Sequence, residues 1–259
     1  MLNDKYIKSI FKSKSFQRLN FKYPDENWMR HPENEYSQNS LGLRDDEFEN
    51  FKEGYTKFLF AGCSMTEGVG LPKKYMWSEN VKKHIKKTND KTQFYNIGMG
   101  GVSTQLIIKN IVNFIKEYGK PDYIFLMLPD LGRLVEYEDE LYVNNVSSKD
   151  INLETLFFYD ANILMLFEEF CNTNNIKLFL MSWHYQTYKL YNETGLKLYK
   201  ILDHGLEPIY FTKNIKQYKD PLLFRGSDGI HPGGLWNWAV ADMIIKYYEK
   251  EKNENIRHK

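Results

Sequence analysis

Four short apolar runs, each ended by glycine, proline or serine, constrain the fold of this chain more than any other feature. They span residues 58–61, 94–97, 123–128 and 176–181, and a weaker fifth run spans 208–211. Their length and apolarity are typical of buried strands in a parallel sheet. Because segments with helical periodicity separate them, the sequence predicts a three-layer α/β fold with a parallel five-stranded sheet flanked by helices.

Three segments between and after these runs show helical periodicity. Thr104 is expected to cap the first helix, which ends at Gly119 and Pro121. The last helix is expected to follow Gly233 and Gly234. The apolar positions that repeat at helical spacing are Ile108, Ile111, Val112 and Ile115 in the first helix, Leu156, Ile163, Phe167 and Phe170 in the second, and Trp236, Val240, Met243 and Tyr247 in the third.

The apolar pattern begins only at residue 58. Residues 1–57 are polar and are broken by Pro24, Pro32 and Gly54, which is typical of an arm or an irregular cap. Residues 58–259 have no internal repeat and no low-complexity linker, and their length suits one domain. We therefore expect an N-terminal arm over 1–57 and a single domain over 58–259.

Composition excludes several classes of protein. The chain has 35 Lys and Arg against 34 Asp and Glu, so nothing in its charge indicates a nucleic-acid partner. Two cysteines and the unpaired spacing of six histidines predict neither a disulfide framework nor a metal site. No apolar run is long enough for a transmembrane span, and the N-terminus lacks the apolar core of a signal peptide. A cytoplasmic location is therefore expected, with virion association and non-classical export left open.

Ligands of parallel sheets bind beyond the carboxyl ends of the strands, which directs attention to the turns that follow the apolar runs. Ser64 follows the first run, in the stretch 62–68, and is a candidate nucleophile. A phosphate cradle or an ordinary turn stays open as an alternative, although the GK[ST] ending of a P-loop is missing. The glycines of 98–101 follow the second run, where a backbone N–H can approach a substrate closely.

A third candidate segment precedes the last predicted helix. Asp228 and His231 stand three residues apart there, which suits a general base held by a carboxylate. A capped helix start with an incidental histidine is the alternative.

These three segments, in this order, resemble the motifs of the SGNH/GDSL hydrolase family over roughly residues 58 to 250. The resemblance implies a flavodoxin-like sheet, with Ser64 as nucleophile and Asp228 and His231 completing the catalytic set. It also implies an oxyanion hole formed by the N–H groups of Ser64 and Gly101. Cys63 replaces the aspartate of the family's first block, and we expect it to be a small buried residue. The stretch 39–44, Asn-Ser-Leu-Gly-Leu-Arg, resembles a segment found ahead of that block in some members.

The chain departs from the family after the third run. Asp130 occupies the place where the family has an asparagine that donates to the oxyanion. An ionised carboxylate cannot donate and would repel the oxyanion, so Asp130 must be protonated, be offset by Arg133, or leave the hole with two backbone donors. Arg133 and His184 are candidate substrate contacts.

The resemblance implies an esterase that forms an acyl-enzyme on Ser64, acts on a small-molecule or carbohydrate ester, and needs no metal or organic cofactor. Three alternatives stay open: an acyltransferase with the same apparatus, a carbohydrate O-acetylesterase, and an inactive binding or structural module. The sequence does not define the acyl or alcohol part of the substrate, the oligomeric state or the role of residues 1–57.

Overall fold

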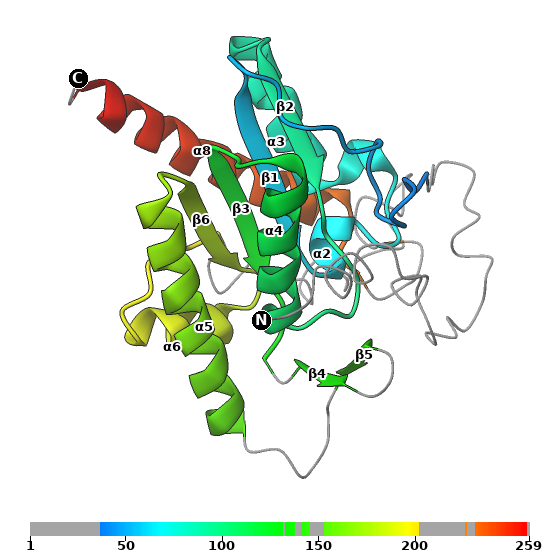
Figure 1. Cartoon of the computed structure of the whole chain (residues 1–259), viewed down its shortest axis with the longest axis vertical. Coiled ribbons are helices and arrows are strands. Elements are labelled where there is room, and N and C mark those ends of the chain that lie inside the picture. Colours follow the sequence, from blue (N-terminus) through cyan, green and yellow to red (C-terminus); the bar gives the residue numbers. More distant parts are fainter. Residues whose placement is uncertain are drawn as a thin grey trace.

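The computed structural model describes residues 37–131, 133–137, 141–145, 153–201, 226 and 231–257. Its main sheet has five parallel strands in the order β2-β1-β3-β6-β7 (Figure 1). The strands are β1 (Thr56–Gly62), β2 (Thr92–Asn96), β3 (Tyr123–Leu128), β6 (Lys177–Ser182) and β7 (Leu198–Tyr199). The predicted α/β class and the parallel five-stranded sheet are therefore confirmed.

The sequence does not predict the fifth strand of the described sheet, β7. The run at 208–211 lies outside the described residues, and the strand that pairs with β6 is β7. β7 has two residues, so it carries no apolar run that a sequence pattern could detect.

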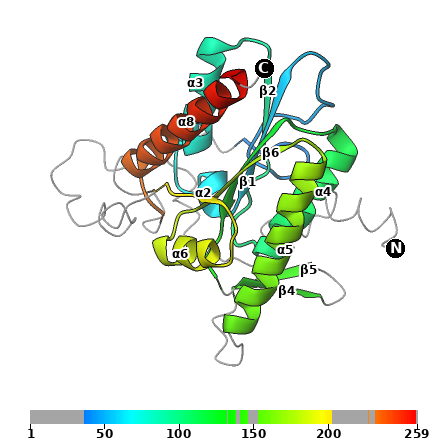
Figure 2. The same ribbon diagram turned by 90° about the vertical axis from the view of Figure 1, so that its left-hand side faces the viewer.

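Helices cover both faces of the sheet in three layers (Figures 1 and 2). α3 (Trp77–Thr88) and α8 (Gly234–Arg257) lie on one face, and α4 (Thr104–Tyr118) and α5 (Leu153–Thr173) lie on the other. Side chains of β1 alternate between the two faces, so Phe58 and Phe60 pack with α3 and α8 while Leu59 packs with α4 and α5. This alternation divides the buried apolar residues into two cores.

The core beneath α3 and α8 contains a ladder of aromatic rings that crosses the sheet. The Phe58 ring stacks on Phe94 with 4.6 Å between centroids, and Phe125 stacks on Phe179 at 4.8 Å. Phe58 and Phe125 have near-parallel planes at 6.3 Å, so the four rings form one row across β2, β1, β3 and β6. Aromatic pairs of this kind contribute about 0.5–1.5 kcal/mol each beyond their area burial.

Two details of the helices differ slightly from the prediction. Thr104 is the first residue of α4, and Ser103 is its cap, because the Ser103 side chain accepts the Leu106 N–H at 3.3 Å. In α8 the fully buried stripe runs through Trp236, Val240 and Ile244, one residue beyond the expected Met243.

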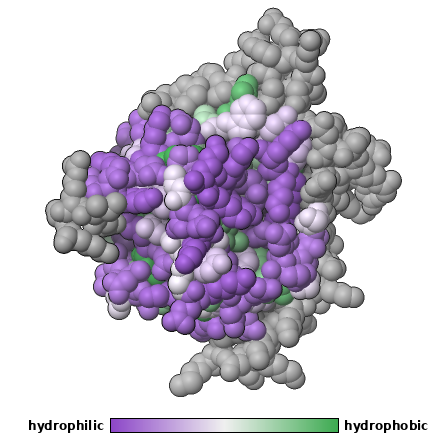
Figure 3. Space-filling model, turned by 90° about the horizontal axis from the view of Figure 1, so that it is seen from above, coloured by the Kyte–Doolittle hydropathy of each residue, from purple (hydrophilic) through white to green (hydrophobic). Residues whose placement is uncertain are grey.

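Several short elements were not predicted. They are α2 (Ser64–Glu67), the 3₁₀ helix η3 (Lys73–Tyr75), the antiparallel pair β4 (Arg133–Tyr137) and β5 (Leu141–Asn145), and α6 (Tyr185–Glu193). α2 and the β4–β5 pair lie at the carboxyl end of the main sheet in Figure 1. The opposite end of the molecule presents a mainly hydrophilic surface with scattered apolar residues (Figure 3).

The described part of the expected arm, residues 37–55, packs on the domain. Leu43 is buried in the core beneath α4, and the Phe51 N–H donates to the Tyr118 carbonyl at 3.0 Å. The Tyr95 hydroxyl donates to the Glu49 carbonyl at 2.9 Å. This stretch is therefore joined to the domain by both apolar and polar contacts.

Candidate active site

Ser64 lies at the point where the order of the strands reverses. The chain passes from β1 outward to β2 and then returns to place β3 on the other side of β1, so the turns after β1 and β3 diverge there. Open α/β sheets bind ligands at such a switch point. Ser64 follows β1 as the first residue of α2, and Asp130 follows β3.

Gly62 and Cys63 allow the tight turn that presents Ser64. Gly62 has φ +152°, and a Cβ there would lie 2.6 Å from the Met127 carbonyl oxygen, so a side chain at this position would collide with β3. Cys63 is 1% exposed, which confirms the expected small buried residue. Ser64 is 9% exposed, and its hydroxyl and N–H have no hydrogen-bond partner within the described ranges. Both groups therefore remain available to a ligand.

The glycine loop after β2 reaches the same place. The Met99 N–H donates to the Gly62 carbonyl at 3.0 Å, and a methyl group at Gly100 would lie 3.7 Å from the Ser64 Cβ. The Gly100 N–H donates to the Glu67 carboxylate at 2.7 Å. Gly101 adopts φ +76°, and its N–H has no partner among the residues that the structure describes. Of these two neighbouring glycines, Gly101 is thus the one with a free donor.

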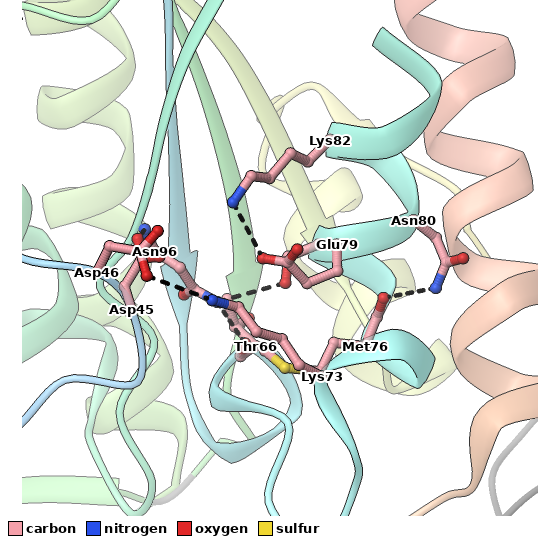
Figure 4. A network of polar contacts seen from close by, with 10 residues as sticks. Asp45, Asp46, Thr66, Lys73, Met76, Glu79, Asn80, Lys82 and Asn96 are labelled. Atoms are coloured by element: carbon pink, nitrogen blue, oxygen red, sulfur yellow. Dashed lines mark hydrogen bonds and ion pairs between the residues drawn. The ribbon is translucent and has the colours of Figure 1, made fainter. Parts of the chain in front are cut away.

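Asn96 joins the glycine loop to α2 (Figure 4). Its side-chain amide donates to the Thr66 carbonyl at 3.0 Å. Its side-chain oxygen accepts the Gly98 N–H at 2.8 Å. A Cβ on Gly98 would lie 2.6 Å from the Glu67 backbone nitrogen, so the two loops touch backbone to backbone. The close packing leaves room only for glycine at position 98.

Asp45 holds Asn96 from the side opposite to α2 (Figure 4). Its carboxylate accepts the Asn96 N–H at 2.7 Å. Burial raises the pKa of Asp45 to about 6, although this hydrogen bond and the charge of Lys82 act in the opposite direction.

Asp130 and Arg133 form an ion pair beside the glycine loop. The guanidinium lies 3.3 Å from the Asp130 carboxylate and also donates to the Val102 carbonyl at 3.5 Å. Burial raises the pKa of Asp130, while the nearby Arg133 and His184 act in the opposite direction. The structure therefore brings Asp130, Arg133 and His184 into one electrostatic group. The His184 ring also contacts the Thr187 hydroxyl at 3.2 Å.

His231 lies just ahead of α8, and its carbonyl accepts the Gly226 N–H at 2.8 Å. Asn237 anchors the first turn of α8, since its side-chain oxygen accepts the Trp77 N–H at 3.1 Å. In Figures 1 and 2 this end of α8 lies at the level of α2. Asp228, the expected partner of His231, lies outside the described residues.

Sequence reasoning missed three residues that shape this region: Arg44, Asp45 and Glu67. All three are buried, with exposed fractions of 3–6%. Their partners are mostly backbone groups, which have no signature in the sequence. The sequence offers only indirect signs of their role: Arg44 lies in the segment 39–44, and Glu67 lies between Ser64 and Gly68.

No group of His, Cys, Asp and Glu side chains in the described part of the chain is arranged to hold a metal ion. Within the same ranges, no helix combines the length and apolarity needed to cross a bilayer.

No protein-family model and no curated protein matches the chain. Solved structures do match, and they include esterases and lipolytic proteins of the GDSL type. The psychrotrophic esterase EstA from Pseudoalteromonas sp. has a TM-score of 0.48 and 13% identity, with 76% of this chain and 99% of that chain covered. A GDSL-like lipase from Bacteroides thetaiotaomicron has a TM-score of 0.45 and 13% identity, with coverages of 89% and 100%.

A member of the lipolytic protein G-D-S-L family from Veillonella parvula has a TM-score of 0.44 and 17% identity. The alignment covers 73% of this chain and 96% of that chain. The observed five-stranded parallel sheet is the architecture that the sequence resemblance to SGNH/GDSL hydrolases implies.

Proposed function

We propose that this chain is a serine hydrolase that cleaves carboxylic esters through an acyl-enzyme on Ser64. The observation that carries the proposal is the arrangement at the switch point of the sheet. There the Ser64 hydroxyl, the Ser64 N–H and the Gly101 N–H are all without partners in the described part of the chain, and the two loops that bear them are in contact. A nucleophile with unpaired backbone N–H donors on its own and a neighbouring loop suits acyl transfer.

In the acylation step, His231 takes the proton of the Ser64 hydroxyl while the oxygen attacks the ester carbonyl carbon. The N–H groups of Ser64 and Gly101 stabilise the oxyanion. As the intermediate collapses, the bond to the alcohol oxygen breaks and His231 returns the proton to the leaving alcohol. Asp228 orients the imidazole and stabilises its charged form. Water then repeats the cycle and releases the acid.

Asp130 and Arg133 replace the side-chain donor of the family's oxyanion hole. An ionised Asp130 would oppose the oxyanion, but the adjacent Arg133 guanidinium neutralises it at 3.3 Å. We therefore propose an oxyanion hole with two backbone donors and a side-chain pair that is neutral overall.

The substrate class is a small-molecule or carbohydrate ester, with O-deacetylation of a carbohydrate as one form of the reaction. Arg133 and His184 are proposed to contact the substrate. Arg133 lies against the loop of Gly101, and His184 follows β6, the strand adjacent to β3.

Reaction with a fluorophosphonate probe tests the proposal without knowledge of the substrate. We expect a covalent adduct on Ser64 in the wild type, no adduct in Ser64→Ala, and a strongly slowed reaction in His231→Ala. Hydrolysis of p-nitrophenyl acetate by the same three proteins gives the catalytic readout. A folded wild type that neither binds the probe covalently nor hydrolyses the ester contradicts the proposal.

The second candidate function is an inactive binding module with the same fold. The Asp130–Arg133 pair favours it, because it occupies the place of a catalytic donor. The same labelling experiment separates the two, since an inactive module leaves Ser64 unmodified.

A further inference from the structure

We propose that Arg44 and Asp45 are positioning residues, each of which holds one of the two loops that carry the backbone donors of the site. Their effect on catalysis rests on the proposed function, whereas their effect on the two loops does not. Arg44 ends the segment 39–44, which has no part in the proposed mechanism, and Asp45 follows it directly.

The segment forms a compact turn that Asn39 closes. The Asn39 side-chain oxygen accepts the N–H groups of Leu41 and Leu43 at 3.1 and 3.0 Å, and Gly42 adopts φ +76°. Leu43 anchors the turn in the apolar core. The turn therefore directs the next two residues, Arg44 and Asp45, into the protein, where they are 3% and 6% exposed.

Arg44 binds backbone carbonyl groups at the end of α2 and in the loop after it. Its guanidinium donates to the Gly68 carbonyl at 2.5 Å and to the Leu71 carbonyl at 2.6 Å, with a longer contact to Glu67 O at 3.4 Å. The Gly68 N–H in turn donates to the Ser64 carbonyl at 2.9 Å. Arg44 is thus connected through one short segment to the residue proposed as nucleophile.

Asp45 binds the start of the other loop, at the end of β2. Its carboxylate accepts the Asn96 N–H at 2.7 Å (Figure 4). The Asn96 side-chain oxygen accepts the Gly98 N–H at 2.8 Å. Gly98 leads directly to Gly101, the second proposed oxyanion donor. Two adjacent residues therefore fix both sides of the proposed oxyanion hole relative to a common turn.

The geometry gives Arg44 a role that lysine cannot fill. A planar guanidinium presents several N–H groups in a fixed fork, whereas an ammonium is a compact point charge. Lysine at position 44 keeps the positive charge but cannot span the carbonyls of Gly68 and Leu71 in the same way. A displacement of about 1 Å at a catalytic group costs on the order of 100-fold in rate.

Amide hydrogen exchange of the full chain tests the positioning directly. In Arg44→Lys we expect exchange in residues 63–72 to rise by on the order of 10-fold, with little change in α5. Asp45→Ala is expected to raise exchange in residues 97–103. Asp45→Asn keeps an acceptor oxygen and should exchange in this stretch at the wild-type rate. Arg44→Gln is a second variant in case Arg44→Lys does not fold. The control is Glu47→Gln, since Glu47 binds Ser40 on the exposed side of the same turn.

Ester hydrolysis by the same variants provides the catalytic readout. We expect kcat to fall by on the order of 10-fold or more in Arg44→Lys and Asp45→Ala, with KM nearly unchanged and Asp45→Asn close to wild type. Unchanged exchange in the folded variants overturns the inference, and so does a uniform rise over the whole chain. If the wild type itself proves inactive, the proposed function fails, while the exchange data still decide whether Arg44 and Asp45 hold the loops.

Discussion

The Glu67 carboxylate accepts the backbone N–H of Gly100 at 2.7 Å, which ties the helix that begins with Ser64 to the glycine loop beside it. Glu67 is the last residue of α2, which follows β1, and Gly100 lies in the loop that follows the neighbouring strand β2. Glu67 is 6% exposed, and the hydrogen bond is partly buried.

Removal of this contact is expected to loosen the loop that carries Gly101. In Glu67→Ala the partly buried Gly100 N–H loses its acceptor, which costs about 1 kcal/mol or more in the free energy of unfolding. Glu67→Gln keeps an acceptor oxygen and should lose much less. Urea denaturation and the rate of fluorophosphonate labelling show whether Glu67→Ala loses more than Glu67→Gln. Equal losses in the two variants would contradict the assigned hydrogen bond.

A methyl group at position 98 is expected to displace α2. The Cβ of Gly98→Ala would lie 2.6 Å from the Glu67 backbone nitrogen, and backbone cannot move aside as a flexible side chain can. Overpacking of this kind costs about 1–3 kcal/mol and should also slow labelling of Ser64. Gly100→Ala is the matched control, because its nearest neighbour is the end of the Glu67 side chain, 3.0 Å away. Gly98→Ala should therefore be the more damaging variant in both thermal unfolding and labelling.

Asp130→Asn is expected to increase esterase activity. The asparagine amide can donate to the oxyanion, as the resemblance to SGNH/GDSL hydrolases implies. One such donor is worth roughly 100- to 1000-fold in turnover. A gain on the order of 10-fold would already show that the side chain at position 130 faces the oxyanion. Steady-state kcat for p-nitrophenyl acetate is the measurement, with Arg133→Lys as the control that preserves the positive charge. A loss of activity in Asp130→Asn would instead show that the carboxyl group itself takes part.

Asp160 should make the protein less stable as the pH rises from about 4 to about 6. It lies on α5 between α4 and α6, where it accepts hydrogen bonds from Gln105 at 2.8 Å and from the Tyr191 hydroxyl at 3.3 Å. Burial raises its pKa from 3.8 to about 6. The native state therefore binds the proton more tightly than the unfolded state, and the stability that this confers is present below pH 4 and lost by about pH 6.

Asp160→Asn removes this dependence while it keeps polar partners for Gln105 and Tyr191. Relative to wild type, its free energy of unfolding should gain up to about 3 kcal/mol at pH 8 and converge below pH 4. Urea denaturation at several pH values measures both slopes. Glu169→Gln, an exposed change on the same helix, should leave the slope unaltered. If the free energies of unfolding of wild type and Asp160→Asn change with pH in parallel, Asp160 is not the source of the pH dependence.

The strands that the sequence predicts correctly have an apolar interior and a clear stop. Tyr123–Leu128 has the expected bounds because it is fully apolar in its interior and is followed by Pro129. β7 was missed because two residues give no pattern, and it exists only through pairing with β6. The antiparallel pair β4 and β5 also lacks a turn signature that stands out against the polar sequence around it.

The candidate site could be predicted only in part for a related reason. Ser64 and the glycine loop follow apolar strands, so their place at the end of the sheet could be deduced from local sequence. Arg44 and Asp45 act on backbone groups 23 to 51 residues away, and any residue supplies such groups. Tertiary contacts of this type become visible only in the fold.

The aromatic ladder has a consequence for how the chain folds. Its rings come from four strands that are separated in sequence by helices, and the register places Phe58 opposite Phe94 and Phe125 opposite Phe179. A slip of one residue in any strand would turn its ring to the other face of the sheet, so stacking rewards a single alignment. Parallel pairing of distant segments is intrinsically slow, because loop closure precedes any contact. The full row of stacked rings is complete only when each of the four strands has paired with its neighbour in the native register.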